Sequence, residues 1–254
     1  MNFQVKAMDF SSAYRFADNT INAIRFPEAF DFDQGVLGDF LGYGEDSFYL
    51  RISKPQKNTL LHEFIHSVNY SGIEWETGHC DAVDLIKTYT PMMAGVGVDI
   101  PKWFTENQLS DHTHELDELL FEVSRVFSEA AFHLLFSDRD FLFLFSNFIG
   151  DYVKKTKCTD NATMKKDGVV RRCSYLPQWL KNAVYHRDKG RCQICTQDLT
   201  KLIVPIGRLH FDHMLPLEES GTNDPTNFQL LCETCNTSKG KNSIVKKQLT
   251  YTFW

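Results

Sequence analysis

Residues 209–217 of the chain have the sequence LHFDHMLPL, and residues 230–236 have the sequence LLCETCN. The second stretch ends in a C-x-x-C pair, and an earlier pair lies in CQIC at residues 192–195. Each C-x-x-C turn directs two thiolates towards one point, so two such turns complete a tetrahedral sulfur shell for Zn²⁺. A thioredoxin-like redox site would need one pair, not two. We therefore expect a structural zinc ion bound by Cys192, Cys195, Cys232 and Cys235.

The 36 residues between Cys195 and Cys232 exceed the usual spacing of a zinc ribbon, and they contain polar side chains that a ribbon does not need. The whole pattern is C-x-x-C, D-H-x-x-P-L, then N-x-x-x-L-C-x-x-C-N-x-x-K. It resembles the zinc-bearing branch of the HNH endonucleases, whose core is a β-hairpin and a helix around one catalytic metal ion. The resemblance extends from about Tyr185 to Lys241.

This resemblance implies a role for each matching residue. Asp212 would be a metal ligand at the end of a strand, and His213 would be the general base. Asn227 would hold the loop that orients His213, and Asn236 would be the second metal ligand. Carboxylate and amide oxygens suit Mg²⁺ or Mn²⁺, and a neutral imidazole can take a proton from water near neutral pH.

Basic side chains around this motif are candidates for contacts with phosphates, which position a nucleic acid without reading its sequence. They are Arg208, Lys239 and Lys241. His210 lies three residues before His213 and is expected to be a hydrogen-bonded or phosphate-facing histidine. A zinc-stabilised binding module without catalysis is the alternative, but it would not require the Asp-His pair or the two asparagines.

The two halves of the chain carry opposite charge. Residues 1–152 contain 10 Lys+Arg and 24 Asp+Glu, a net charge of −14, whereas residues 153–254 contain 17 and 9, a net charge of +8. Such asymmetry indicates two units with different partners, and the basic unit is a candidate for binding a polyanion. A basic surface can also be merely solvated, so charge alone leaves nucleic-acid binding open.

Patterns of apolar residues predict the elements of the acidic half. Asn58–Tyr70 and Glu115–Phe136 have helical spacing, and Phe141–Ile149 continues as an aromatic segment typical of a packed core. Ser47–Ser53 (SFYLRIS) alternates between polar and apolar residues, which predicts a strand that ends before Pro55.

The basic half is predicted to contain a helix at Leu176–Tyr185, a strand at Arg208–Phe211 and a helix from about Cys232. The stretch before them is polar and lacks an apolar period. We therefore expect an α+β protein in three parts: an acidic, helix-rich domain at 1–152, a basic linker at 153–174, and a ββα-metal HNH domain at 175–254.

A second motif, HEFIH at residues 62–66, lies in the acidic half. On a helix, His62 and His66 share a face that can bind Zn²⁺, and Glu63 is placed to activate a water molecule. With the strand predicted at 47–53, this segment resembles the edge strand and active-site helix of zincin metallopeptidases.

The third ligand of such a site has two alternatives. SprT-like proteases use a downstream histidine, which implies His79, whereas other zincins use a glutamate of a later helix, here Glu118 or Glu122. The site would hold a second zinc ion. In the opposing interpretation, His62 and His66 are ordinary histidines of a helical domain, so metal analysis would find one zinc per chain rather than two.

Further expectations concern compartment and partners. No apolar run reaches the roughly 18–20 residues of a membrane span, and MNFQVKAMDFSSAYRF lacks the pattern of a secretory signal. We expect a cytoplasmic protein without membrane contact. Cutting both strands with a single-metal nuclease often needs two copies, which favours a homodimer or larger assembly. The acidic half could dock a protein partner or mask the basic half, an autoinhibitory arrangement.

The sequence thus predicts an endonuclease that uses Mg²⁺ or Mn²⁺ to hydrolyse phosphodiester bonds, of DNA in preference to RNA, with antiviral defence against phages as the leading context. The alternative hypothesis is a zinc metalloprotease or partner-binding protein whose C-terminal domain tethers it to DNA.

Overall fold

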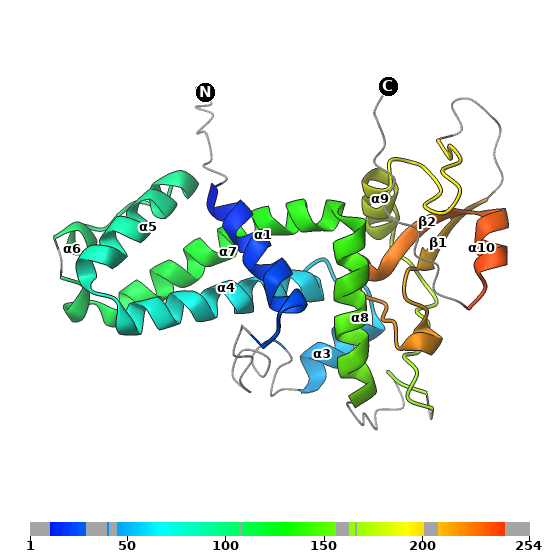
Figure 1. Cartoon of the computed structure of the whole chain (residues 1–254), viewed down its shortest axis with the longest axis horizontal. Helices are drawn as coiled ribbons and strands as arrows, with labels where there is room; N and C mark the ends of the chain where they lie inside the picture. The colour runs from blue at the N-terminus through cyan, green and yellow to red at the C-terminus, as the bar shows by residue number, and fades with distance from the viewer. Residues whose placement is uncertain are drawn as a thin grey trace. The chain divides into compact units, whose positions relative to one another are not determined.

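The computed structural model describes residues 11–28, 40, 45–106, 108–155, 163–165, 167–200 and 208–241 (Figure 1). The chain divides into two compact units. Unit 1 comprises Met1–Phe40 and His62–Leu134, and unit 2 comprises Leu41–Leu61 and Leu135–Trp254. None of the helices in the described ranges is both long and apolar enough to cross a membrane.

Unit 1 is built from helices over its described residues. They are α1 (Ser11–Arg25), α4 (Leu60–His79) from His62 onward, α5 (Ala82–Val96), α6 (Lys102–Thr105), the 3₁₀ turn η1 (Leu109–Asp111) and α7 (Thr113–Ser137) up to Leu134 (Figure 1). Aromatic rings form its core: Phe16 lies 5.7 Å from Phe127 and Phe64 lies 5.2 Å from Phe40, between ring centroids. These rings are almost fully buried, so apolar burial stabilises the unit.

Unit 2 combines helices with a two-stranded sheet. Its elements are α3 (Glu45–Ser53), α8 (Arg139–Lys155), α9 (Gln178–Arg187), β1 (Leu209–His213), the 3₁₀ turns η2 (Leu217–Glu219) and η3 (Pro225–Asn227), β2 (Phe228–Cys232) and α10 (Glu233–Lys239). The strands pair antiparallel, from Leu209 opposite Cys232 to His213 opposite Phe228. The predicted α+β class with a C-terminal β-hairpin and helix is confirmed.

The core of unit 2 lies between α9 and the sheet. Leu180 and Val184 of α9 pack with Phe228, Leu230 and Leu231 of β2. All five residues of β2 are buried. A strand that is buried on both faces shows no alternation of polar and apolar residues, so the sequence pattern did not reveal β2, although the predicted strand at 208–211 corresponds to β1.

The predicted strand at Ser47–Ser53 is wrong, because these residues belong to helix α3. Phe48 and Ile52 are 4% and 0% exposed, whereas Leu50 is 47% exposed. A strand would place all three on one face, but burial at positions i and i+4 with exposure at i+2 is the helical period. The apparent alternation of SFYLRIS therefore reflected one helical face.

The predicted helices correspond to helices of the structure with shifted ends. Asn58–Tyr70 corresponds to α4, which begins at Leu60, and Glu115–Phe136 corresponds to α7. The aromatic segment Phe141–Ile149 lies inside α8, and Leu176–Tyr185 corresponds to α9.

The two units divide the chain differently from the boundaries expected at residues 152 and 174. Residues 41–61 and 135–152, which belong to the expected acidic domain, group with the C-terminal residues in unit 2. Within the expected linker, Met164 and Val170 form an antiparallel bridge and are buried. Linker residues 156–162 and 166 lie outside the described residues.

Candidate functional site

The four cysteines come together as predicted. One pair follows α9, and the other begins α10, where the Cys232 thiol accepts a hydrogen bond from the backbone N–H of Cys235. All four sulfur atoms lie within 4.8 Å of one another, and Cys195 Sγ is 3.8 Å from Cys232 Sγ. A tetrahedral zinc ion with Zn–S bonds of about 2.3 Å requires sulfur atoms about 3.8 Å apart. The cluster therefore fits a structural zinc ion.

The four thiols differ in the direction in which their surroundings shift the pKa. Burial raises the pKa of Cys195 and of Cys235, so these thiols resist ionising unless a cation compensates their charge. At Cys192, backbone N–H groups outweigh the effect of burial and lower the pKa to about 7. In the described ranges, these cysteines are the only group of three or more His, Cys, Asp or Glu side chains close enough to share an ion.

A second group of polar side chains lies where β1 faces α10. Asp212 Oδ2 is 2.8 Å from Lys239 Nζ, and the Lys239 side chain is 1% exposed. Asn236 Nδ2 is 3.3 Å from His210 Nδ1. His210 and Asp212 are two residues apart on a strand and therefore share a face, and Asn236 and Lys239 share a face of α10. The two predicted metal ligands, Asp212 and Asn236, thus belong to facing surfaces.

These side chains offer suitable donors for a divalent cation. The Asp212 carboxylate already contacts a positive charge, the ammonium of Lys239. The Asn236 amide directs its nitrogen to His210, which leaves its oxygen as an acceptor. Carboxylate and amide oxygens are the ligands that Mg²⁺ and Mn²⁺ prefer. Donors of this type are therefore present between β1 and α10, and the ammonium of Lys239 occupies Oδ2 of Asp212.

His213, at the end of β1, is enclosed by the loop that follows it. The side chain is 2% exposed, packs on the ring of Phe228, and places Nε2 3.1 Å from Asn223 Oδ1. Burial, and then the charge of Arg172, lower the pKa of His213 to about 4. The imidazole is therefore neutral near pH 7, and it is a weaker base than a free histidine.

Asn227 closes this loop through its side chain. Its Oδ1 accepts a hydrogen bond from the backbone N–H of Leu215 at 2.8 Å. Its Nδ2 donates to the carbonyl oxygens of Leu215 and Thr222, both at 2.9 Å. With all its hydrogen-bonding atoms occupied and 1% of its surface exposed, Asn227 fixes the path of the chain between β1 and β2.

Two further loop residues were not predicted. Asn223 donates through its side chain to the carbonyl oxygens of Ser53 and Arg171, at 3.0 and 2.7 Å. Asp224 accepts a hydrogen bond at 2.8 Å from the backbone N–H of Leu60, the first residue of α4. An Asn-Asp pair in a polar loop is typical of any turn, so only the fold reveals that it binds segments more than 160 residues earlier.

The candidate phosphate contacts occupy different environments. Arg208 is exposed at the start of β1, and Lys241 is exposed after α10, with Nζ 3.7 Å from Glu218 Oε1. Lys239, in contrast, is buried against Asp212. The exposed pair can reach a polyanion directly, whereas Lys239 lies beside the predicted metal ligand.

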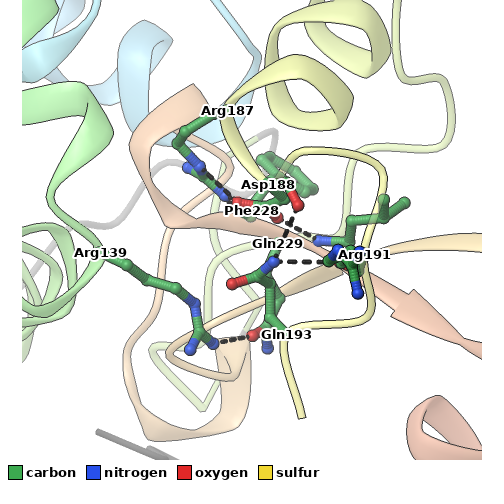
Figure 2. A network of polar contacts seen from close by, with 8 residues as sticks. Arg139, Arg187, Asp188, Arg191, Gln193, Phe228 and Gln229 are labelled. Atoms are coloured by element: carbon green, nitrogen blue, oxygen red, sulfur yellow. Dashed lines mark hydrogen bonds and ion pairs between the residues drawn. The ribbon is translucent and has the colours of Figure 1, made fainter. Parts of the chain in front are cut away.

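A buried polar network connects α8 and the end of α9 to β2 (Figure 2). Arg139 of α8 donates to Oε1 of Gln229, whose Nε2 donates to the carbonyl oxygen of His213 at 3.3 Å. Arg187 forms an ion pair with Asp188 at 2.8 Å, and Asp188 accepts from the backbone N–H of Leu230 at 2.7 Å. Both α8 and α9 therefore fix the strand that pairs with the functional residues.

The predicted zincin-like zinc site has no support among the described residues. His62 stacks on Phe132 with ring centroids 3.5 Å apart, and its Nε2 lies 3.5 Å from Oε2 of Glu129. His66 packs against the rings of Tyr70 and Phe121. Burial lowers the pKa of His66. These contacts are those of histidines packed between helices.

The proposed third ligand cannot complete the site. His66 and His79 lie 13 residues apart on the uninterrupted helix α4, which separates their backbones by roughly 20 Å. His79 instead stacks on Trp75. Neither Glu63 nor the alternatives Glu118 and Glu122 join a metal-binding group within the part of the chain that the structure describes. The edge strand of a zincin is also missing, since α3 occupies its place in the sequence.

Comparison with known protein families gives a match for residues 192–242, to the family described as HNH endonuclease. This segment is an HNH domain. The matched HNH residues include the four-cysteine cluster, β1, β2 and α10, which confirms the resemblance inferred from the motif. Comparison with curated proteins and with solved structures gives no match. The HNH domain indicates a nuclease that binds nucleic acid and a divalent metal.

Proposed function

We propose that the protein is a divalent-metal-dependent endonuclease that hydrolyses phosphodiester bonds of DNA. The observation that carries this proposal is the coincidence of the HNH match at 192–242 with a β1–β2–α10 unit in which Asp212 and Asn236 belong to facing surfaces. A zinc-stabilised binding module would need the four cysteines, but not this second group of polar side chains.

Asp212 and Asn236 would hold Mg²⁺ or Mn²⁺ through oxygen atoms. When bound, such an ion would supply positive charge beside the scissile phosphate and the leaving oxygen. His213 would accept the proton of the attacking water through a neutral ring nitrogen. Asn227 holds the loop behind His213, so the chain contributes the orientation of the base as well as the base itself.

The charge of unit 2 supports a nucleic-acid substrate. Residues 41–61 and 135–254 contain 21 Lys+Arg and 14 Asp+Glu, a net charge of +7. Arg208 and Lys241 would contact phosphates from the surface, and Lys239 would act beside Asp212. Contacts of this kind position a strand without reading its bases. Parallel cleavage assays on DNA and on RNA of the same sequence test the preference for DNA.

Unit 1 would have a separate, regulatory role. It contains 6 Lys+Arg and 19 Asp+Glu, a net charge of −13, which suits docking of a basic protein partner or masking of the basic nuclease surface. Replacing several exposed acidic residues of unit 1 by amides should raise the cleavage rate if unit 1 masks the nuclease. An unchanged rate would exclude masking.

We further propose a role in antiviral defence in the cytoplasm and an assembly of two or more copies when both strands are cut. Phage infection of cells that express the wild type or His213→Ala tests the first. A protein that stays monomeric in analytical ultracentrifugation while it linearises plasmid in one step would exclude the second.

Plasmid cleavage tests the proposed activity. The purified protein is incubated with supercoiled plasmid and Mg²⁺ or Mn²⁺, beside a reaction with EDTA and a reaction of the Asp212→Ala variant. We expect nicked or linear product only for the wild type with metal. Equal product in the EDTA reaction or with Asp212→Ala would refute the metal-dependent mechanism.

A further inference from the structure

Glu218 of η2 lies among positive charges from three separate segments of unit 2. Its Oε1 is 3.7 Å from Nζ of Lys241, which follows α10. The charges of Lys165 and Arg172, which precede the matched HNH segment, act on the same carboxylate. The hydrogen bond from its own backbone N–H, and then these three cations, lower the pKa of Glu218 against the effect of burial. The carboxylate is therefore ionised and surrounded by cations.

A short hairpin holds two of these cations beside the loop between β1 and β2. The described residues between 163 and 171 form this hairpin, and its antiparallel bridge is buried. The carbonyl oxygen of Arg171 accepts a hydrogen bond from Nδ2 of Asn223 at 2.7 Å. Lys165 directly follows one residue of the bridge, and Arg172 directly follows the Asn223 contact. The backbone at both residues is therefore anchored, while their side chains are exposed.

The cluster lies next to the candidate catalytic residues. The charge of Arg172 acts on His213 as well as on Glu218. Lys165, Arg172 and Lys241 are all exposed, so a ligand in solution can reach them. Lysine and arginine side chains form strong, charge-assisted hydrogen bonds with phosphate as well as with carboxylate. The surroundings of the Glu218 carboxylate therefore also suit a phosphate group of a nucleic acid.

We propose that Lys165, Arg172 and Lys241 form a phosphate-binding cluster for the DNA substrate, and that Glu218 occupies this cluster while DNA is absent. This inference rests on the proposed nuclease function. Binding of DNA then exchanges the ion pair between Lys241 and Glu218 for contacts with phosphates. An exposed ion pair contributes little free energy, so DNA displaces it at small cost. Because Glu218 competes with phosphate for the same cations, it lowers the affinity for DNA.

The cluster extends the substrate surface beyond the matched HNH segment. Glu218 and Lys241 lie within the match, whereas Lys165 and Arg172 belong to the stretch that was expected to be a linker. A linker gives its cations no fixed position. The two hydrogen bonds of Asn223, with the carbonyl oxygen of Arg171 and the backbone N–H of Cys173, instead attach this stretch to the loop between β1 and β2.

Fluorescence anisotropy of a labelled DNA duplex tests this inference on the full, zinc-loaded chain. Mg²⁺ and Mn²⁺ are omitted, so that binding is measured without cleavage. We expect Lys165→Ala to weaken binding by up to about fivefold, and Glu218→Gln to strengthen it by a similar factor. Glu218→Gln should strengthen binding less in a Lys241→Ala background, because the cation nearest to Glu218 is then absent.

Two control variants separate a local effect from a change in net charge. Glu233→Gln removes an exposed acid of α10 in the same unit, and Lys102→Ala removes an exposed lysine of α6 in unit 1. Both should change the affinity for DNA less than the matching variants of the cluster. Equal gains in Glu218→Gln and Glu233→Gln would refute the competition by Glu218. A Lys165→Ala variant that binds as tightly as Lys102→Ala would refute the phosphate contact.

The outcomes also distinguish this inference from the proposed function. If the wild type cleaves plasmid but Lys165→Ala and Glu218→Gln bind DNA as the wild type does, the cluster is wrong while the nuclease assignment stands. If both variants change the affinity as expected but the wild type never cleaves DNA with Mg²⁺ or Mn²⁺, the proposed function fails and the cluster stands.

Discussion

Removing the carboxylate of Asp224 should loosen the loop between β1 and β2. Its Oδ2 accepts from the backbone N–H of Leu60 at 2.8 Å, and its Oδ1 accepts from the backbone N–H and the hydroxyl of Thr226 at 3.0 and 2.5 Å. The side chain is 1% exposed. Leaving a buried hydrogen-bond partner unsatisfied costs about 1–3 kcal/mol, and a lost helix cap costs about 1 kcal/mol. We therefore expect Asp224→Ala to lower the local stability of unit 2 by about 2–4 kcal/mol.

Asp198 provides a matched control. It forms the same Asp-x-Thr turn, with Thr200 N–H at 3.1 Å and Thr200 Oγ1 at 3.0 Å, in a half-buried surface turn. Asp198→Ala should therefore have a smaller effect, because water can solvate the groups that it releases. The difference between the two variants isolates the contribution of the Leu60 contact and of burial.

Hydrogen–deuterium exchange followed by mass spectrometry measures the stability of individual segments. A local measurement is needed because a chain with two units need not unfold in one step. In peptides that cover β2 and the first turn of α4, Asp224→Ala should accelerate exchange by about 30-fold or more, the equivalent of about 2 kcal/mol. Exchange no faster than in Asp198→Ala would refute the view that residues 45–61 are part of the nuclease unit.

Other variants test further parts of the structure. Gly221→Ala should prevent folding of the loop, because an added Cβ would lie 1.9 Å from the carbonyl oxygen of Leu215. In the control Gly78→Ala, the added Cβ meets no atom within 4 Å, so the melting temperature should be unchanged or raised. Metal analysis should find one zinc ion per chain, lost in Cys232→Ser and kept in His66→Ala; two zinc ions would contradict our account of α4. Arg172 is exposed, and its charge acts on His213. Arg172→Ala should therefore weaken DNA binding and reduce the slope of the logarithm of the binding constant against the logarithm of the salt concentration by about 1. An unchanged slope would exclude a phosphate contact.

The sequence was most informative where spacing is tied to chemistry. Two C-x-x-C pairs have one common geometric use, so the cluster of Cys192, Cys195, Cys232 and Cys235 could be predicted without a structure. The order of Asp212 and His213 before the second pair pointed to the HNH fold for the same reason. In both patterns, the spacing of a few residues is set by the geometry of the group that they bind.

Local pattern failed where tertiary contacts decide. In α3, Phe48 and Ile52 satisfy both a strand and a helical period, and burial selects the helix. The HEFIH motif has the spacing of a zinc site, but His62 and His66 pack against rings of α7. A motif of two histidines specifies a helix face and not the third ligand, which only the fold supplies.

The expected domain boundaries depended on charge and on the polar stretch before residue 174, and neither of them reports packing. Unit 2 keeps a positive net charge, yet its loop is bound through Ile52, Ser53 and Leu60 from the acidic half. No local pattern predicts a hydrogen bond across more than 160 residues. A fragment of residues 175–254 lacks these partners, so we expect its loop to be less ordered than that of the full chain.

The cleavage rate of His213→Ala tests the assignment of the base most directly. His186→Ala is the matched control, since His186 is an exposed histidine of α9 in the same unit. In single-turnover reactions with Mg²⁺ or Mn²⁺ and excess protein over DNA, we predict that His213→Ala cuts on the order of 100-fold more slowly than the wild type while His186→Ala cuts at the wild-type rate. A His213→Ala variant that cuts as fast as His186→Ala would contradict the assignment of His213 as the base.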